Sequence, residues 1–388
     1  MNCSETVYCF TCMRAHDGSI QVYELFGQEV ENSSFEKLKS KIELIEEAVE
    51  SDIESLFRPK DYLVSPINSP DRFLAGRYFL NDHQEEIKNR VITGLSEDKY
   101  IWGIKGGAGT GKTLLLYDIV KTLAVRYRVC IIHAGLLSEG HKKLSSRFEN
   151  VSIIDAKSIE KETMRSFDII CVDEAHRLYT STLDDILELL VSRDIMGCIF
   201  SYDYTQCLSK AERRRNNPER LKNIVGFSEE KLTERIRTNK EIFSFIRSML
   251  RLKDTNRKPM NYDCIDIVYA NTTQEADKLL DIYLRKDYKF ITLTPSQYYS
   301  NEIDHFARFD NSHQVIGQEF DNVVIIIDNN FRYSSDGELE GKVHPNPNYL
   351  FPKLFYQNIT RAREKLCVIV LNNPSMFETL LRIKDNSL

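Results

Sequence analysis

One glycine-rich stretch constrains the fold of this chain more than any other. Residues 106 to 113 read Gly-Gly-Ala-Gly-Thr-Gly-Lys-Thr, which fits the G-x-x-x-x-G-K-T pattern of a phosphate-binding loop, or P-loop. The apolar residues 100 to 104 before it predict a strand, and residues 114 to 124 after it predict a helix. Strand, glycine loop and helix in this order are the context that the motif requires.

The residue types in this loop suit a nucleotide with bound magnesium. Glycines let successive backbone N–H groups face phosphate oxygens, and the following helix adds the positive end of its dipole. We expect Lys112 to reach the outer phosphates of ATP and Thr113 to offer its hydroxyl to Mg²⁺. The alternative is a glycine-rich turn without a ligand. The predicted phosphate-binding residues are Gly106, Gly107, Ala108, Gly109, Thr110, Gly111, Lys112 and Thr113.

A second motif follows about sixty residues later. The apolar residues 167 to 172 predict a buried parallel strand, which ends in Asp173-Glu174-Ala175-His176. A carboxylate at a strand end can hold Mg²⁺, and a second one beside it can polarise the attacking water. We therefore expect Asp173 to join Thr113 as a metal ligand and Glu174 to be catalytic. A solvated acidic turn is the alternative.

Length and composition set broad limits. The 388 residues suffice for two ordinary domains, and 42% hydrophobic with 28% charged residues are typical of a globular protein. No run of about eighteen apolar residues predicts a membrane span, and the N-terminus has no signal-peptide pattern. Nine scattered cysteines favour reduced thiols and a cytoplasmic protein. The net charge of −6 argues against a generally basic nucleic-acid surface, but not against a local basic groove.

The order of strands and helices predicts the domain organisation. Strands alternate with helices from the P-loop unit to the C-terminus, which predicts parallel α/β sheets. We expect an N-terminal extension over residues 1 to 70, a first domain over 71 to 240 and a second over 241 to 388. In the extension, residues 6 to 13 and 20 to 25 predict a hairpin, and residues 35 to 57 a helix.

Two further segments leave alternatives open, and two more predict local structure. Cys9 and Cys12 form a CxxC, but without a second pair we favour two thiols on a strand over a metal site. The run Arg213-Arg214-Arg215 is either a solvated face or a phosphate contact. The polar residues 328 to 349 predict a long loop. Thr238 and Glu241 predict a capping box at the start of a helix.

Taken together, these motifs resemble a superfamily 1 helicase core, and more narrowly the Schlafen-like DNA/RNA helicase ATPases. The resemblance covers about residue 75 to the C-terminus. The D-x-x-Q at 203 to 206 and the Thr360-Arg361-Ala362 favour superfamily 1 over superfamily 2, although the DEAH of residues 173 to 176 also occurs in the latter. The segments that carry the resemblance are residues 80–84, 106–113, 173–176, 203–206, 232–238, 313–321 and 360–363.

The resemblance implies two RecA-like domains with ATP between them, and it implies roles for further residues. Gln84 would read the adenine, and Gln206 would sense the γ-phosphate. Arg237 would be an arginine finger, and Arg361 a second γ-phosphate contact. Ile316 stands where the family usually has lysine, and little sequence is left for accessory domains. Processive unwinding is therefore not implied.

Three functions follow as hypotheses. The first is an ATP-driven translocase or helicase on single-stranded DNA or RNA. The second is an ATP-driven conformational switch that regulates a partner protein through residues 1 to 70, without unwinding. The third is a core that binds ATP without turnover, which the intact Lys112, Thr113, Asp173 and Glu174 disfavour.

Overall fold

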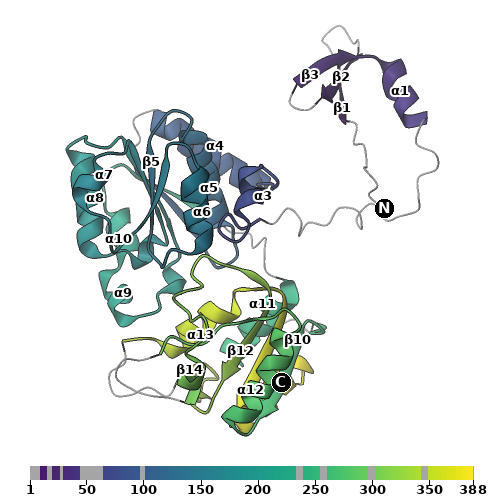
Figure 1. The fold of residues 1–388 in the computed structure, drawn as a ribbon, viewed down its shortest axis with the longest axis vertical. Helices are drawn as coiled ribbons and strands as arrows, with labels where there is room; N and C mark the ends of the chain where they lie inside the picture. Colours follow the sequence, from purple (N-terminus) through teal and green to yellow (C-terminus); the bar gives the residue numbers. More distant parts are fainter. Residues whose placement is uncertain are drawn as a thin grey trace. The chain divides into compact units, whose positions relative to one another are not determined.

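A computed structural model describes nine segments of the chain, and the residues divide into two compact units. The segments are residues 9–14, 20–26, 29–43, 64–96, 101–232, 239–253, 260–295, 302–341 and 348–387. The first unit spans residues 1–59 and the second spans residues 60–388 (Figure 1). The domain boundaries expected at residues 70 and 240 stay predictions.

Among its described residues, the first unit holds a small antiparallel sheet and one helix. Strands β1 (Cys9–Arg14), β2 (Ile20–Phe26) and β3 (Glu29–Ser33) pair in the order β1-β2-β3. The predicted hairpin is confirmed by the antiparallel pairing of β1 with β2, whereas β3 was not predicted. Helix α1 (Phe35–Glu43) confirms the start of the predicted helix, and residues 44–57 lie outside the described segments.

In the second unit, the first sheet has six parallel strands in the order β6-β5-β7-β8-β4-β9. The P-loop strand β4 and the acidic strand β7 are separated only by β8, so their carboxyl ends lie at one edge of the sheet. Strand β9 was not predicted. The strands are β4 (Ile101–Gly106), β5 (Val129–His133), β6 (Val151–Asp155), β7 (Ile169–Asp173), β8 (Gly197–Tyr202) and β9 (Phe227–Leu232).

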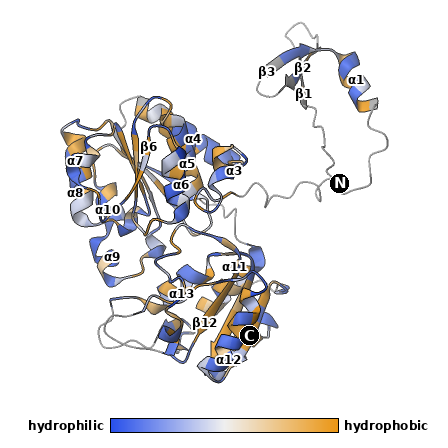
Figure 2. Ribbon diagram, in the orientation of Figure 1, coloured by the Kyte–Doolittle hydropathy of each residue, from blue (hydrophilic) through white to orange (hydrophobic). Residues whose placement is uncertain are grey.

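Helices cover both faces of this sheet because alternate strand residues point to opposite sides. Ile131 belongs to one hydrophobic cluster and Ile132 to the other. The first cluster includes residues of α3 (Pro70–Leu74), α4 (Asp82–Ser96), α5 (Lys112–Leu123) and α6 (Glu139–Arg147). The second includes residues of α7 (Lys161–Met164), α8 (Thr180–Val191) and α10 (Asn217–Lys222). Figure 2 shows hydrophobic strands between helices whose outer faces are hydrophilic.

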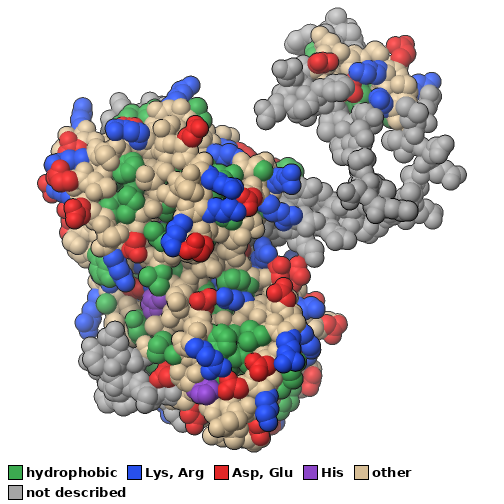
Figure 3. All heavy atoms as spheres, in the orientation of Figure 1, with side chains coloured by type: hydrophobic (Ala, Val, Ile, Leu, Met, Phe, Trp, Pro, Cys, Tyr) green, Lys and Arg blue, Asp and Glu red, His purple; other side chains and the backbone are tan. Residues whose placement is uncertain are grey.

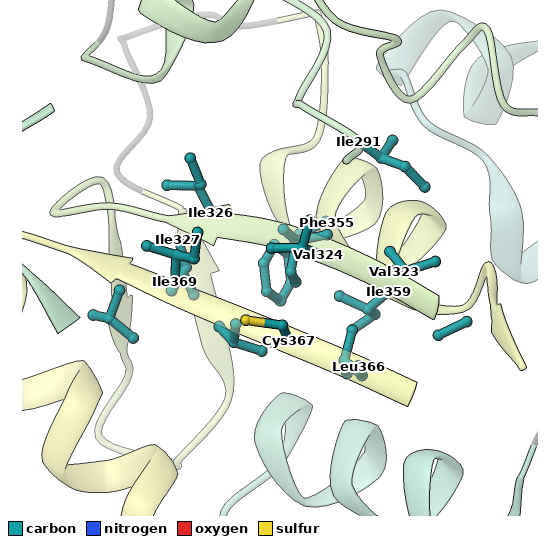
Figure 4. Packing of buried hydrophobic residues seen from close by; sticks show 14 of the residues in the cluster. Ile291, Val323, Val324, Ile326, Ile327, Phe355, Ile359, Leu366, Cys367 and Ile369 are labelled. Carbon is teal, nitrogen blue, oxygen red and sulfur yellow. The ribbon is translucent and has the colours of Figure 1, made fainter. Parts of the chain in front are cut away.

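The second sheet of this unit has four parallel strands in the order β10-β15-β12-β11. They are β10 (Ile265–Ala270), β11 (Lys289–Phe290), β12 (Phe320–Ile327) and β15 (Ala362–Leu371). The helices around it are α11 (Lys240–Leu250), α12 (Thr273–Leu284), α13 (Phe351–Ile359) and α14 (Pro374–Lys384). Figure 4 shows Phe355 and Ile359 of α13 among apolar side chains of β12 and β15. The predicted class, two parallel α/β sheets of the RecA-like kind with a small α+β extension, is confirmed.

Two local predictions need correction. The stretch expected to be an irregular loop contains the antiparallel pair β13 (Phe331–Tyr333) and β14 (Leu339–Gly341). Helix α11 is capped by Asn239, whose side chain accepts from the backbone N–H of Glu241 at 2.8 Å. The expected cap, Thr238, lies outside the described residues.

The second unit has two halves, one around the six-stranded sheet and one around the four-stranded sheet. Two backbone hydrogen bonds connect them. The N–H of Leu350 donates to the carbonyl of Leu208 at 2.9 Å, and that of Lys210 to Asn348 at 2.8 Å. Leu208 is fully buried in the hydrophobic cluster of the second sheet, although it follows a strand of the first. Among the described residues, no helix is long and apolar enough to cross a membrane.

Candidate nucleotide site and the neighbouring cleft

The P-loop joins β4 to the N-terminus of α5. Gly111 caps this helix with a φ of 82°, in the left-handed region that favours glycine. A Cβ on Gly106 would lie 2.4 Å from the Thr110 hydroxyl oxygen, so the tight loop excludes a side chain there. Both the Thr110 hydroxyl and the Lys112 ammonium donate to the Gly107 carbonyl at 3.0 Å. The loop and helix dipole together make an anion site.

Gln84, the predicted adenine contact, lies against this loop. Helix α4 carries it, and its side chain is 1% exposed. Its amide nitrogen donates to the Thr110 carbonyl at 3.3 Å, and its amide oxygen accepts from the Asn81 N–H at 3.1 Å. Its contact with adenine stays a prediction.

Asp173 ends β7 and is completely buried. One carboxylate oxygen, Oδ1, accepts from the Ser201 hydroxyl at 2.5 Å and from the Glu174 N–H at 3.1 Å. The other, Oδ2, lies 3.4 Å from the Thr113 hydroxyl. Burial would raise the pKa of Asp173, but His133, Ser201 and Lys112 outweigh it, and the pKa lies below its ordinary value. A hydroxyl beside an ionised carboxylate fits Mg²⁺, which prefers oxygen ligands.

Glu174 has an unusual backbone conformation. Its φ of 59° and ψ of 41° lie in the left-handed region, which costs a residue with a side chain about 1–3 kcal/mol. The turn places its side chain in the same pocket as Lys112 and Thr113. His176 Nε2 lies 3.6 Å from a Glu174 carboxylate oxygen, while His176 Nδ1 accepts from the Asp203 N–H at 3.2 Å. Burial lowers the pKa of His176.

Gln206 and Arg361 meet although they are far apart in sequence. A guanidinium nitrogen of Arg361 lies 3.3 Å from the Gln206 side-chain oxygen. Arg361 also donates to the carbonyl oxygens of Gln318 at 3.0 Å and Gln357 at 3.1 Å, and it is 5% exposed. The pocket between the halves is lined by Ala108, Gly109, Gly111, Lys112, Thr113, Glu174, Gln206, Gly317, Glu319 and Arg361.

The expected sites are therefore gathered with one exception. Arg237 lies outside the described residues. Ile316 does not line the nucleotide pocket. It lines a separate cleft instead, while its neighbour Gly317 faces the P-loop side.

That separate cleft has a volume of about 420 Å³ and is lined by residues of both halves. Tyr179 is 43% exposed. The Arg215 guanidinium lies over its ring, 4.7 Å from the ring centre. On the other side, the rings of His313 and Tyr349 lie 5.1 Å apart. Burial lowers the pKa of His313 to about 4, so its ring is neutral at pH 7. Of the basic run, Arg215 donates to the Arg177 carbonyl at 2.6 Å, while Arg213 and Arg214 are exposed.

Sequence reasoning missed two histidines beside Asp173. His133 ends β5 and stands opposite Asp173 in the strand register, and His141 lies in α6. Both are completely buried. A polar residue at the end of an apolar strand next to an acidic strand was the available signal.

The CxxC hypothesis is not tested, because nothing is described of the Cys9 and Cys12 side chains. In the described part of the chain, no cluster of His, Cys, Asp and Glu has the arrangement of a metal site. The six cysteines with described side chains are free thiols, and five of them are buried.

Comparison with known proteins identifies the core. Residues 99–289 match the family model of Schlafen group 3, DNA/RNA helicase domain. The resemblance to a superfamily 1 helicase core of Schlafen-like type is thereby confirmed. The match ends before residues 313–321 and 360–363. No curated protein matches the chain.

Solved structures of Pif1 helicases are similar at low level. One is a Pif1 helicase from Bacteroides in complex with ADP-AlF3 and ssDNA, with 13% identity and a TM-score of 0.40 over 75% of this chain and 92% of that one. Another is Pif1 from Candida albicans, with 14% identity and a TM-score of 0.40 over 79% and 98%. At these TM-scores the likeness is too slight to support an inference about this chain.

Proposed function

We propose that this chain is an ATP-dependent translocase or helicase of superfamily 1 type that acts on single-stranded DNA or RNA. One observation carries the proposal: residues from both halves of the second unit line the same pocket. Lys112, Thr113 and Glu174 come from the first half, and Arg361 comes from the second. Hydrolysis would therefore depend on the relative position of the halves.

Each residue has a role that its chemistry supports. Lys112 and the P-loop amides bind the phosphates, and Gln84 contacts the adenine. Thr113 and Asp173 hold Mg²⁺, which neutralises phosphate charge when bound. Glu174 takes a proton from a water molecule while the water oxygen bonds to the γ-phosphorus. At the same time the bond between the γ-phosphorus and the bridging oxygen breaks, and ADP leaves. Gln206 orients that water.

The two arginines compensate the charge of the transferring phosphoryl group. Such cations accelerate phosphoryl transfer by about 10³–10⁵-fold in related enzyme classes. The Arg361 guanidinium already contacts four oxygen acceptors, so little reordering of this side chain is needed. Arg237 is the second arginine in this proposal. ATP favours the closed arrangement of the halves, and hydrolysis releases it.

The neighbouring cleft is the proposed path of the single strand. Tyr179 and Tyr349 offer aromatic faces on which bases stack regardless of sequence. Figure 3 shows basic and acidic side chains interspersed over the visible face, so binding would depend on this local cleft. The proposal covers movement along a strand and leaves strand separation out.

A second candidate is an ATP-driven switch that regulates a partner protein. The observation that favours it is the separate contact unit formed by residues 1–59. In this case the partner protein would respond to closure of the pocket, and nucleic acid would not be needed for ATP turnover.

ATP hydrolysis with and without single-stranded DNA or RNA tests the proposal. We expect strong stimulation by a polymer and a loss of about 10²-fold or more in Lys112→Ala, because the phosphates lose their cation. Tyr179→Ala should lower the stimulation while ATP still binds. Hydrolysis that responds to neither polymer would reject the translocase and favour the switch.

A further inference from the structure

A buried histidine lies beside the proposed magnesium carboxylate. His133 Nδ1 is 3.6 Å from Asp173 Oδ2, and both side chains are completely buried. The His141 ring lies behind it, with 4.3 Å between ring centres. Among the described residues, neither ring nitrogen of His133 has a hydrogen-bond partner. A buried polar group without a partner costs about 1–3 kcal/mol, so its place beside Asp173 needs an explanation.

The backbone of two glycines comes close to the His133 ring. A Cβ on Gly135 would lie 2.7 Å from His133 Nε2, and one on Gly317 would lie 3.6 Å from His133 Cε1. Gly135 lines the proposed nucleic-acid cleft, and Gly317 lines the nucleotide pocket. His133 therefore lies close to residues of both sites, and a side chain at Gly135 would clash with its ring.

The two oxygens of Asp173 have different surroundings. Oδ1 is held by two hydrogen bonds, from Ser201 and from the Glu174 backbone. Oδ2 faces the Thr113 hydroxyl and His133 Nδ1. An Nδ1–H directed at Oδ2 would fix the second oxygen, as outer partners do for metal-binding carboxylates.

We propose that His133 is a positioning residue that holds Asp173 Oδ2 toward Thr113 and thereby sets how tightly this pair binds a divalent cation. The inference rests on the proposed function only in taking Thr113 and Asp173 as the Mg²⁺ ligands. His133 itself is not proposed as a ligand, and among the described residues no group of His, Cys, Asp and Glu has the arrangement of a metal site.

The test is the magnesium dependence of nucleotide binding, which needs no turnover. The dissociation constant of a fluorescent ATP analogue is measured in EDTA and in Mg²⁺. The ratio of the EDTA value to the Mg²⁺ value, which is larger when Mg²⁺ tightens binding more, is then compared between wild type and variants. His133→Gln should lower the ratio by about 10-fold, the lower end for outer partners of metal ligands, because its amide cannot take the place of Nδ1. His133→Asn should restore it, because its amide nitrogen falls near the Nδ1 position.

His141→Asn is the matched control, because it removes an equally buried ring that does not face the carboxylate, and its ratio should match wild type. If His133→Gln keeps the wild-type ratio, or His133→Asn loses as much as His133→Gln, the inference is overturned. The inference would also be overturned if wild type binds the nucleotide no more tightly in Mg²⁺ than in EDTA. If single-stranded DNA and RNA fail to stimulate ATP hydrolysis, the translocase is rejected. That result does not affect the ratio of dissociation constants, so the inference about His133 stands or falls separately.

A second measurement does not depend on whether the variants fold. In wild type, the imidazole ¹⁵N signals should show His133 as the Nδ1–H form, and its Nδ1 signal should shift when Mg²⁺ joins bound nucleotide. An Nε2–H form or an unmoved signal would contradict the proposal.

Discussion

At the scale of residues, Arg361 connects the halves of the proposed site. Its planar guanidinium donates to Gln206, Gln318 and Gln357 at once. A lysine keeps the charge but has no such fork. The geometry of the group should therefore matter as well as its charge.

We predict that Arg361→Ala and Arg361→Lys both lower kcat for ATP hydrolysis, by about 10³-fold for Ala, while nucleotide binding changes much less. The expected cause is loss of charge stabilisation in phosphoryl transfer. Steady-state kinetics and nucleotide titration check this. Arg363→Lys is the matched control, because Arg363 lies two residues further along, in β15, and pairs with Asp321 at 2.5 Å. A wild-type kcat in Arg361→Ala would contradict the assignment.

At the scale of elements, the start of α6 depends on a neutral histidine. The Ser138 N–H donates to His141 Nδ1 at 3.0 Å. Burial, with the neighbouring His133, lowers the pKa of His141 to about 3 from an ordinary value of 6.5, while Asp173 acts in the opposite direction. The folded protein therefore holds this ring neutral at pH values where the unfolded chain protonates it.

Because the folded pKa lies below the unfolded one, stability is lost as pH falls below 6.5, down to about 3. The loss is about 1.4 kcal/mol per pH unit. We predict that His141→Asn, whose side-chain oxygen can still accept from Ser138, has a shallower decline between pH 6.5 and 5. Urea unfolding followed by the fluorescence of the single, buried Trp102 measures it. Equal slopes in wild type and variant would reject this origin of the acid sensitivity.

At the scale of the whole molecule, the chain has two units with separate interiors. Each of the large hydrophobic clusters lies within residues 60–388. The proposed ATP site and the cleft are also built from residues of that unit. Stability and turnover should therefore belong to it.

We predict that residues 60–388 alone unfold at the same urea midpoint as the full chain, read by Trp102 fluorescence, because no cluster loses a member. ATPase assays on the same fragment then separate the two proposed functions. Retained stimulation by single strands favours the translocase, and a changed basal rate favours a regulatory role of residues 1–59. A clearly lower midpoint would show that the first unit stabilises the second.

The sequence by itself determined the parallel α/β class, and it indicated most of the residues of the proposed nucleotide site. The P-loop and the Asp-Glu pair are local motifs, and their strand and helix contexts follow from short-range apolar patterns. Only the tertiary structure decided which distant residues meet. His133 lies beside Asp173 because β5 and β7 are neighbouring strands. Arg361 reaches Gln206 across two different sheets, through packing of one half of the unit on the other. The β13–β14 pair and the burial of Leu208 in the second sheet also depend on contacts between segments far apart in the chain, which local patterns do not encode.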